Sequence, residues 1–362
     1  MVTLGVEEEY LLLDLDSGLP VARSAQVRAA ADLLPAVEGG EVEPELLQAQ
    51  VEVGTPVCET LDEVGEHLTR LRAAVRGAAR EAGCRLAACG ASPLRASVPV
   101  PVTAEPRYRS LSDDAPQLVD EQLINGMHVH VAIPDRDSGV AALNRLQAWL
   151  PVLVALGANS PLWEGGDTGF ASWRTLVFGR WPVSGPPPSF ADAADYQRRT
   201  QALLEAGTIR DRGQLYWQAR LSERYPTLEV RALDVQLEIR DAVTLAGVVR
   251  ALVTTALRDH GSGRGFTHTD PELVTAAVWQ AARHGLSGRL VHPLTGRSVP
   301  APEVVATLLD HLTPALEASG DLIRVRTGIE RLQSAGSGAC RQSRAFQDGG
   351  IEAVLELITD LT

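Results

Sequence analysis

The sequence of 362 residues contains no lysine, so all 33 of its basic residues are arginines. This absence excludes the phosphate-binding lysine of a Walker loop and the lysine that forms a Schiff base with pyridoxal phosphate or a carbonyl substrate. Any phosphate group bound here must be held by arginine, by backbone N–H groups or by a metal ion. The missing lysine therefore narrows the chemistry before any motif is considered.

Cysteine and long apolar runs are also scarce. The four cysteines form no C-x-x-C pair, and a disulfide framework is not expected from so few in a chain of this length. No run of about 18 apolar residues is present, which is the length a membrane-spanning helix needs. The first residues do not match a signal peptide, because three glutamates begin at Glu7. We therefore expect a cytoplasmic protein without a membrane span.

The charge balance is acidic, with a formal net charge of -13. An acidic chain is a poor candidate for binding nucleic acid or an anionic membrane surface. A hydrophobic content of 45% is sufficient for a sizeable core, and no linker divides the chain, so we expect a single catalytic domain over residues 1–362. Strands and helices follow one another without regular β-α-β alternation, which predicts an α+β fold with an antiparallel sheet.

Hydrophobic periodicity predicts where these elements lie. Strands are expected at 4–14, 48–53, 85–90, 126–133 and 226–236. Helices are expected at 61–82, 140–156, 241–258, 271–284, 302–318 and 321–334, with a short helix at the end of the chain. The stretches 95–118 and 159–189 are expected to be loops, and the glycine-rich stretch 261–265 is expected to be a surface loop because no strand precedes it.

Four of the expected strands carry polar residues at alternate positions, which places them on one face of a sheet. The pairs are Glu7 with Glu9, Gln50 with Glu52, His128 with His130, and Glu229 with Arg231. For any one strand a solvated face is an alternative explanation. Four together cannot form a core face, because unpaired buried charges are too costly, but they can line a metal-binding cleft. The same alternation sends Glu8 to the opposite face, where we expect a structural role.

The residue types in this face favour a hard divalent cation. Several carboxylates with one imidazole suit Mg²⁺ or Mn²⁺. The two imidazoles of His128 and His130 leave Zn²⁺ open, and structural histidines are an alternative. Arg231 should point into the same cleft as Glu229, where a planar guanidinium suits a phosphoryl oxygen.

Several motifs occur in a fixed order along nearly the whole chain. They are Gly5–Tyr10 (GVEEEY), Gln50–Glu52 with Thr55–Cys58, Gly126–Val131 (GMHVHV), Ala158–Trp163, Thr168–Phe170 with Ser172–Thr175, Trp181–Pro182 with Gly185–Pro187, Pro226–Arg231 (PTLEVR) and Ala282–Leu286. In this order the set resembles the carboxylate–amine ligases of the glutamate–cysteine ligase type 2 group.

The resemblance implies a glutamine-synthetase-like catalytic fold, in which an antiparallel sheet forms a funnel backed by helices. It also implies ATP and Mg²⁺, with Mn²⁺ as an alternative metal, and a homo-oligomer. The implied reaction activates the side-chain carboxylate of glutamate as an acyl phosphate. An amine or amino acid then attacks, which gives a γ-glutamyl amide, ADP and phosphate.

The resemblance carries over to individual residues. It places the metal ligands at Glu7, Glu9, Glu52, His128 and Glu229. It also places Arg231 at the transferred phosphoryl group, Arg174 at the α-carboxylate of the substrate, Arg341 near the nucleotide phosphates, and His130 and Thr227 among the substrate-binding residues. These assignments are expectations about single side chains.

One departure from the family pattern affects the amine substrate. Family members usually have an acidic residue in the tryptophan-containing stretch before the Glu-x-Arg strand, and here Gln218 stands there. The amine is therefore not assumed to be cysteine, and a non-protein amino acid is an alternative. Three other functions stay open at this point: a phosphotransferase of the related guanidino-kinase type, a metal-dependent hydrolase, and a non-catalytic binder of metal or nucleotide.

Overall fold

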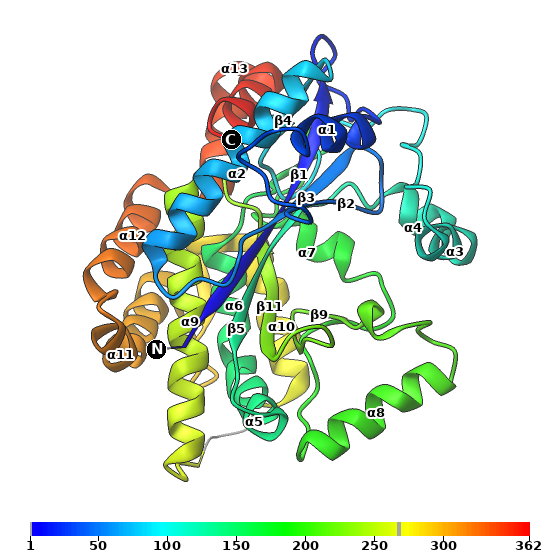
Figure 1. Ribbon diagram of the computed structural model, residues 1–362. Helices are drawn as coiled ribbons and strands as arrows, with labels where there is room; N and C mark the ends of the chain where they lie inside the picture. The colour runs from blue at the N-terminus through cyan, green and yellow to red at the C-terminus, as the bar shows by residue number, and fades with distance from the viewer. Residues whose placement is uncertain (1, 266–268) are drawn as a thin grey trace.

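The computed structural model describes residues 2–265 and 269–362. In this part of the chain, helices pack against one central sheet (Figure 1). The sheet has seven strands in the order β10-β11-β5-β1-β3-β2, and β4 also pairs with β1. The strands are β1 (Leu4–Asp14), β2 (Val42–Pro44), β3 (Gln50–Gly54), β4 (Cys84–Ala87), β5 (Gly126–Ala132), β10 (Ala219–Leu221) and β11 (Thr227–Asp234). Every pair in this sheet is antiparallel, so the predicted α+β class with an antiparallel sheet is confirmed.

Strand register brings the polar residues of different strands next to one another. Glu7 of β1 lies opposite His128 of β5, and Glu9 of β1 lies opposite Glu52 of β3. On the other side of β5, Glu229 of β11 lies opposite His130. Directly opposed residues of an antiparallel pair point to the same face, so one face of the sheet collects these side chains.

The opposite face of the sheet is apolar and packs on helices. Val6, Val129 and Val230 are buried, and each alternates with a polar residue of the other face. The long helix α9 (Ile239–Gly261) contacts β5 and the helices α2, α5, α11 and α12, so it forms the centre of the helical layer. Figure 1 shows α2, α9, α11 and α12 together on one side of the sheet.

The other helices are shorter or lie at the edges. The α-helices are α1 (Ser24–Ala31), α2 (Leu61–Glu81), α3 (Pro106–Asp114), α4 (Pro116–Asp120), α5 (Arg136–Leu146), α6 (Leu150–Leu156), α7 (Trp173–Phe178), α8 (Ala193–Glu205), α10 (Pro271–His284), α11 (Ala301–Ser319), α12 (Leu322–Ala335) and α13 (Gly338–Asp360). Short 3₁₀ turns are η1 (Gln147–Trp149), η2 (Arg212–Gln214) and η3 (Gly285–Ser287). Three two-stranded pairs complete the fold: β6 (Leu162–Trp163) with β7 (Gly166–Asp167), β8 (Ser184–Gly185) with β9 (Tyr216–Trp217), and β12 (Arg289–Val291) with β13 (Ser298–Pro300).

Helix α2 shows how the local sequence sets an element. Thr60 accepts a hydrogen bond from the backbone N–H of Glu63, and the Glu63 carboxylate accepts one in return from the backbone N–H of Thr60. This reciprocal cap satisfies N–H groups that the first turn leaves free. Val64, Leu68 and Leu71 then bury one face of the helix. The helix predicted at 61–82 is therefore confirmed.

Two predicted loops were partly wrong. The stretch 95–118 contains α3 and most of α4, whose first residues are Pro106 and Pro116. Proline was taken as a loop signal, but it also fits the first position of a helix, where its missing N–H costs nothing. The stretch 159–189 contains the one-and-a-half-turn helix α7 and short paired strands.

The end of the chain also differs from the expectation. In place of a short closing helix, α13 runs over Gly338–Asp360, with a break in helical geometry at Gly349 and Gly350. Helices α1 and α8 were not predicted, because alanine and arginine dominate them and leave few apolar residues to mark a period.

One helical stretch is apolar enough to pass as a membrane span by length and composition. It is Arg136–Leu156, which comprises α5, η1 and α6. Its most apolar window is 78% buried inside the protein, and α5 packs against α9 while α6 packs against α10 and β11. The apolar character of this stretch is thus used within the core.

Candidate active site

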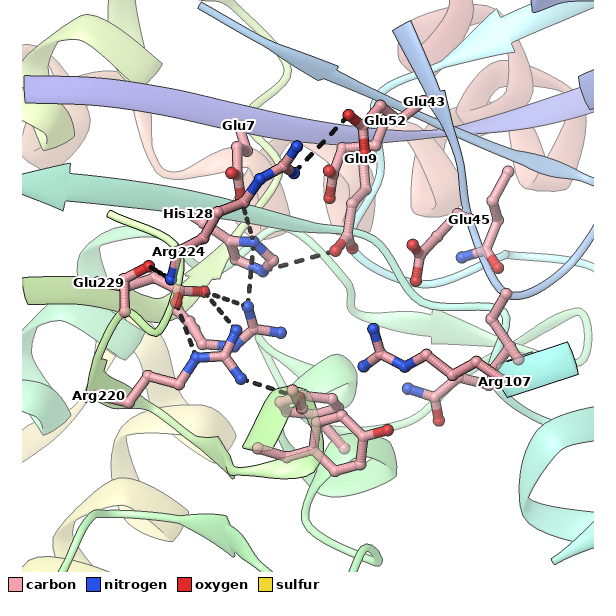
Figure 2. Close-up of a pocket in the computed structure, with 18 of the residues that line it drawn as sticks. Glu7, Glu9, Glu43, Glu45, Glu52, Arg107, His128, Arg220, Arg224 and Glu229 are labelled. Carbon is pink, nitrogen blue, oxygen red and sulfur yellow. Dashed lines mark hydrogen bonds and ion pairs between the residues drawn. The ribbon is translucent and has the colours of Figure 1, made fainter. Parts of the chain in front are cut away.

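A charged cavity of about 350 Å³ lies on the polar face of the sheet. Figure 2 shows glutamate side chains from β1, β3 and the segment before β3 meeting arginine side chains from the opposite wall. All five expected metal ligands line this cavity, as do the expected substrate contacts Arg231, Arg174 and His130. The structure therefore brings eight of the ten predicted site residues into one cavity.

The cavity contains two clusters of candidate metal ligands, and both include His128. Glu7 Oε2 lies 3.1 Å from His128 Nδ1, and Glu7, His128 and Glu229 offer ligand atoms within 4.8 Å of one another. Burial alone would raise the pKa of Glu7, but hydrogen bonds to His128 and His130 hold that pKa well below its usual range. Glu7 is therefore a carboxylate near neutral pH, as a metal ligand must be.

The second cluster of candidate metal ligands also contains His128. Glu9, Glu52 and His128 also offer ligand atoms within 4.8 Å of one another. Glu9 is fixed because its carboxylate accepts a hydrogen bond of 2.5 Å from the backbone N–H of Gly126. Glu9 and Glu52 are directly opposed on neighbouring strands, an arrangement of like charges that destabilises a sheet. An unfavourable arrangement that the fold nevertheless keeps is typical of a functional site.

Glu45 adds a further carboxyl group to this side of the cavity and was not predicted. Burial, reinforced by the charge of Glu9, raises the pKa of Glu45 to about 8. Burial and the charges of Glu7 and Glu45 likewise raise the pKa of Glu52 well above its usual range. Among the described residues, no ion pair to an arginine involves Glu45 or Glu52.

This side of the cavity therefore holds more carboxyl groups than the protein itself can keep ionised. Oxygen-rich donors with a single imidazole match the ligand preference of Mg²⁺ or Mn²⁺. The imidazole nitrogen His128 Nε2 is buried and has no hydrogen-bond partner within the described part of the chain. The residues present thus fit divalent cations bound by Glu7, Glu9, Glu52, His128 and Glu229.

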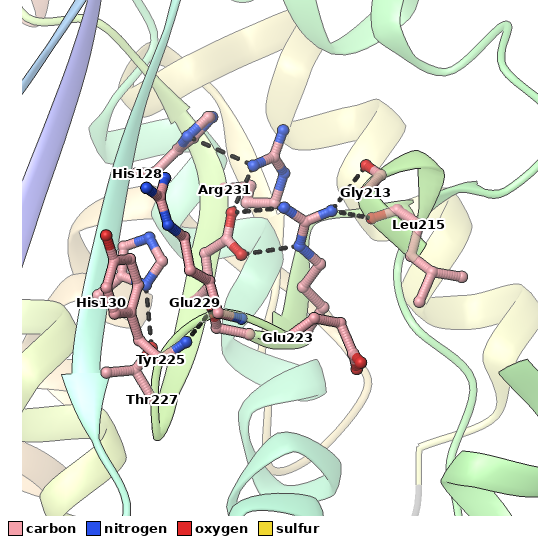
Figure 3. Close-up of polar contacts among 12 residues, drawn as sticks. His128, His130, Gly213, Leu215, Glu223, Tyr225, Thr227, Glu229 and Arg231 are labelled. Atoms are coloured by element: carbon pink, nitrogen blue, oxygen red, sulfur yellow. Dashed lines mark hydrogen bonds and ion pairs between the residues drawn. The ribbon is translucent and has the colours of Figure 1, made fainter. Parts of the chain in front are cut away.

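The opposite side of the cavity is an arginine cluster around Glu229. Arg220 binds Glu229 with both prongs of its guanidinium, at 2.7 and 3.0 Å, and Arg231 Nη1 donates to the same carboxylate. Arg231 Nη1 also lies 3.3 Å from His128 Nδ1, so it joins the two sides of the site (Figure 3). Burial would raise the pKa of Glu229, but the charges of Arg231 and Arg220 lower it strongly.

Hydrogen bonds to the backbone hold the Arg220 side chain in place and so fix the position of this cluster. Its Nη1 donates to the carbonyl oxygens of Gly213 and Leu215 at 2.9 and 3.0 Å. A bidentate arginine–carboxylate pair is both strong and geometrically specific. Arg231 therefore keeps free hydrogen-bonding capacity beside a carboxylate that is already neutralised, which suits it to an anionic ligand.

Arg174 also lines the cavity. It lies in the first turn of α7, although we expected it outside a helix, and its guanidinium donates to the carbonyl of Arg231. Its Nε is buried and has no partner within the described residues. A side chain at Gly126 would come within 2.3 Å of Arg174, so the glycine leaves room for it.

His130 and Thr227 lie at the edge of the site. His130 Nδ1 is 2.9 Å from the Thr227 hydroxyl, and His130 Nε2 is 3.3 Å from Glu7 (Figure 3). Burial would lower the pKa of His130, but Glu7 raises it above the usual value. Thr227 does not line the charged cavity and instead lines a second cavity of about 440 Å³.

The second cavity adjoins the first and is more apolar. Glu7, Glu52 and His130 line both cavities. Glu43, Arg224 and Tyr225 also line both, and the remaining wall of the second comes from segments 3–6, 38–41, 54–57 and 226–227 and from Ala132. The two cavities thus meet at the carboxylate side of the site.

Arg341 is not brought to this site. It lies in the first turn of α13, where its guanidinium pairs with Glu238, and it lines neither cavity. Gln218 does not line either cavity, and its backbone bonds Gly185 and Arg231. Its side-chain oxygen is buried without a partner within the described residues.

Sequence reasoning missed Glu45 and Arg220. Glu45 lies between β2 and β3 rather than on a strand, so alternation could not assign it to a face. Arg220 stands between the buried residues Ala219 and Leu221 on a three-residue strand, and this short alternation is the signal that could have identified it.

The chain is similar to known proteins over nearly its whole length. A family model for the glutamate–cysteine ligase family 2 matches residues 3–357. A proposed glutamate–cysteine ligase 2-2 of Mycobacterium sp. (strain KMS) is 42% identical over 365 residues, covering 99% of this chain and 98% of that protein. A proposed glutamate–cysteine ligase 2-1 of Saccharopolyspora erythraea is 44% identical over 346 residues, covering 96% of this chain and 90% of that protein.

Two solved structures share the fold. A glutamate–cysteine ligase of Francisella tularensis in complex with AMP superposes with a TM-score of 0.72 at 10% identity and covers 99% of this chain and 88% of that one. A bifunctional glutathione synthetase of Pasteurella multocida gives 0.70 at 15% identity and covers 99% of this chain and 51% of that one. The chain belongs to glutamate–cysteine ligase family 2, a family of ATP-dependent ligases that form carbon–nitrogen bonds.

Proposed function

We propose that this protein joins the side-chain carboxylate of glutamate to an amine and makes a γ-glutamyl amide, with ATP converted to ADP and phosphate. The observation that carries the proposal is the single cavity in which the carboxylates around His128 face Arg231, Arg220 and Arg174. Phosphoryl transfer to a carboxylate brings two anions together, so the site must neutralise charge and position the reactants.

The proposed reaction has two steps. In the first, an oxygen of the glutamate γ-carboxylate attacks the γ-phosphorus of ATP, and the bond from that phosphorus to the β,γ-bridging oxygen breaks. ADP leaves and a γ-glutamyl phosphate remains. In the second, the amine nitrogen attacks the γ-carbonyl carbon, the bond to the phosphate oxygen breaks, and the nitrogen loses a proton as the amide forms.

The chain's own residues have distinct parts in these steps. Arg231 faces the transferred phosphoryl group and stabilises its oxygens, because its guanidinium lies between His128 and the neutralised Glu229. Arg174, which also lines the cavity, binds the α-carboxylate of glutamate. Glu7, Glu9, Glu52, His128 and Glu229 would hold Mg²⁺ or Mn²⁺, and the bound metal would neutralise charge on the phosphates.

The two cavities suggest how the substrates are arranged. The apolar second cavity suits the adenine ring, and its shared wall of Glu7 and Glu52 would leave the phosphates beside the metal ligands. His130 and Thr227 lie at this junction and would contact the substrate there. Glutamate and the amine would then enter from the charged cavity. Arg341 has no part in this arrangement, because it pairs with Glu238 outside both cavities.

The test is ADP release from Mg-ATP and glutamate with a panel of amines, with mass detection of the product. The proposal expects ADP only when an amine is present, together with a γ-glutamyl amide. Phosphorylation of a second substrate without amide formation would instead indicate a phosphotransferase. Turnover of a substrate without ATP would indicate a hydrolase. Either result would overturn the proposal.

A further inference from the structure

Part of the wall of the charged cavity is apolar. Leu46, Leu111 and Trp181 are buried within one hydrophobic cluster, and Tyr108 and Tyr216 pack against it. All five side chains line the cavity. The polar site thus continues into a surface on which an apolar group can be buried.

This wall is largely aromatic, and its side-chain polar atoms are the hydroxyl oxygens of Tyr108 and Tyr216 and the indole nitrogen of Trp181. The Tyr216 ring contacts the Trp181 ring at a centroid distance of 5.7 Å. The indole N–H of Trp181, its only donor, is already bonded to the Gln122 side chain at 2.9 Å. Trp181 therefore presents its apolar surface without an unsatisfied polar group, and packing on the core holds the wall in place.

A guanidinium lies at the mouth of the cavity near this wall. Arg107 of α3 precedes Tyr108 and reaches Asp211, with the two charged groups 3.4 Å apart and the side chains 49% and 45% exposed. An ion pair this exposed contributes little to stability. Arg107 can therefore release Asp211 and bind the carboxylate of a ligand instead. Gly213 leaves the space for this guanidinium, since a side chain there would come within 2.4 Å of it. Figure 2 shows Arg107 directed toward the cavity.

Together these features indicate which amine substrate would attack the γ-glutamyl phosphate. We propose that the amine substrate is an α-amino acid with an apolar side chain larger than that of cysteine, whose carboxylate binds Arg107 and whose side chain lies on the wall of Leu46, Tyr108, Leu111, Trp181 and Tyr216. This inference rests on the proposed function. An aromatic and aliphatic wall of this extent buries more apolar surface than a thiol-bearing methylene provides, and burial of such surface is favourable.

The size of the effect follows from the same contacts. In a hydrophobic pocket each methylene changes kcat/KM by roughly 10–200-fold. Leucine or phenylalanine should therefore exceed cysteine in kcat/KM by at least about tenfold. Loss of the carboxylate contact should cost about tenfold in KM, the lower end of the effect of a charge-assisted hydrogen bond.

The experiment is a competition in which the purified enzyme receives Mg-ATP, glutamate and equal concentrations of cysteine, serine, aspartate, leucine and phenylalanine. Mass detection counts each γ-glutamyl product. The inference expects the leucine and phenylalanine products to predominate. Predominance of the cysteine, serine or aspartate product would overturn it while leaving the proposed ligase function intact. Absence of every γ-glutamyl product would overturn the proposed function as well.

Variants test the two contacts separately. Arg107→Met should raise KM about tenfold for leucine but leave it unchanged for 3-methylbutylamine, which lacks the carboxylate. Arg109→Met, on the same helix, exposed and outside the cavity, is the matched control and should change neither. Tyr108→Ser should lower the leucine-to-cysteine product ratio, and Tyr216→Ser provides a second test of the wall should the first variant fold poorly. An equal rise in KM for both amines with Arg107→Met, or an unchanged ratio with both wall variants, would refute the inference.

Discussion

Replacement of Arg72 by methionine should destabilise the protein strongly, although Arg72 lies outside the active site. The guanidinium of Arg72 is only 1% exposed and donates to Glu8 at 3.0 and 2.6 Å. It also donates to the backbone carbonyls of Leu237 and Gln236, both at 3.0 Å. Glu8 is fully buried and receives a further bond of 2.5 Å from Tyr10. One arginine thus joins α2, strand β1 and the segment that follows β11.

The expected cost follows from what Arg72→Met leaves behind. The Glu8 carboxylate would remain buried without its countercharge, and two carbonyl groups would lose their donors. Removal of one partner of a buried ion pair costs about 3–5 kcal/mol. With an m-value near 3 kcal/mol/M, this loss should lower the urea midpoint by about 1–2 M. Activity should fall as well, because β1 carries Glu7 and Glu9 on its other face.

Urea unfolding followed by circular dichroism measures this loss, with Arg80→Met as the control because Arg80 is an exposed arginine of the same helix. The control should change the free energy of unfolding by less than about 0.5 kcal/mol. A triple variant, Arg72→Met with Glu8→Leu and Tyr10→Phe, should be more stable than Arg72→Met alone, because only the two carbonyls, at about 1–3 kcal/mol each, stay unpaired. A loss for Arg72→Met no larger than that of the control would refute the reasoning.

Three further predictions concern the active site. Glu229→Gln should reduce turnover at least about 100-fold with the circular dichroism spectrum retained, because the variant removes the charge that Arg220 and Arg231 neutralise; near-normal activity would contradict the metal assignment of β11. Arg231→Lys should reduce kcat by a similar factor, since a point charge does not reproduce the planar fork; a steady-state assay measures it. The folded protein keeps the proton of Glu45 up to about pH 8, against an ordinary pKa of 4.5, so the metal-free protein should lose stability as pH rises between these values. Thermal melts in EDTA should therefore show Glu45→Gln more stable than the wild type at pH 8 and equal to it below pH 4.5, with excess Mg²⁺ removing the difference; equal melting at pH 8 would refute the role of repulsion.

A helix or strand could be predicted from the sequence where it buries apolar residues at a regular period. Helix α2 and strands β1, β5 and β11 have apolar residues at a clear period, so they were expected near their observed positions. Helix α3 buries only Leu111 and begins with a proline, so no stripe marked it and its first residue indicated a loop. The order of strands in the sheet was also not predictable, because it depends on long-range pairing between segments such as 7–11 and 50–54.

The candidate site divides in the same way. Glu7 and Glu9 were assigned to one face by alternation, and Glu8 to the other, and the structure places them so: Glu8 bonds Arg72 behind the sheet while its neighbours line the cavity. Glu45 gave no such signal, because no period connects a loop residue to a strand that begins five residues later. Arg341 was assigned to the site by resemblance alone, and in the structure its guanidinium forms an ion pair with Glu238.

The division of charge inside the cavity explains how an acidic chain can handle anionic substrates. Glu229 is neutralised by two arginines, whereas burial and neighbouring carboxylates raise the pKa of Glu45 and of Glu52, which have no arginine partner among the described residues. If arginines neutralised both sides, the cavity would bind anions without a metal ion. If they neutralised neither, ATP and glutamate would be repelled. In the proposed reaction, cations would complete the carboxylate side of the site, and Arg231 and His128, 3.3 Å apart, mark the line where the phosphoryl group would cross to the arginine side.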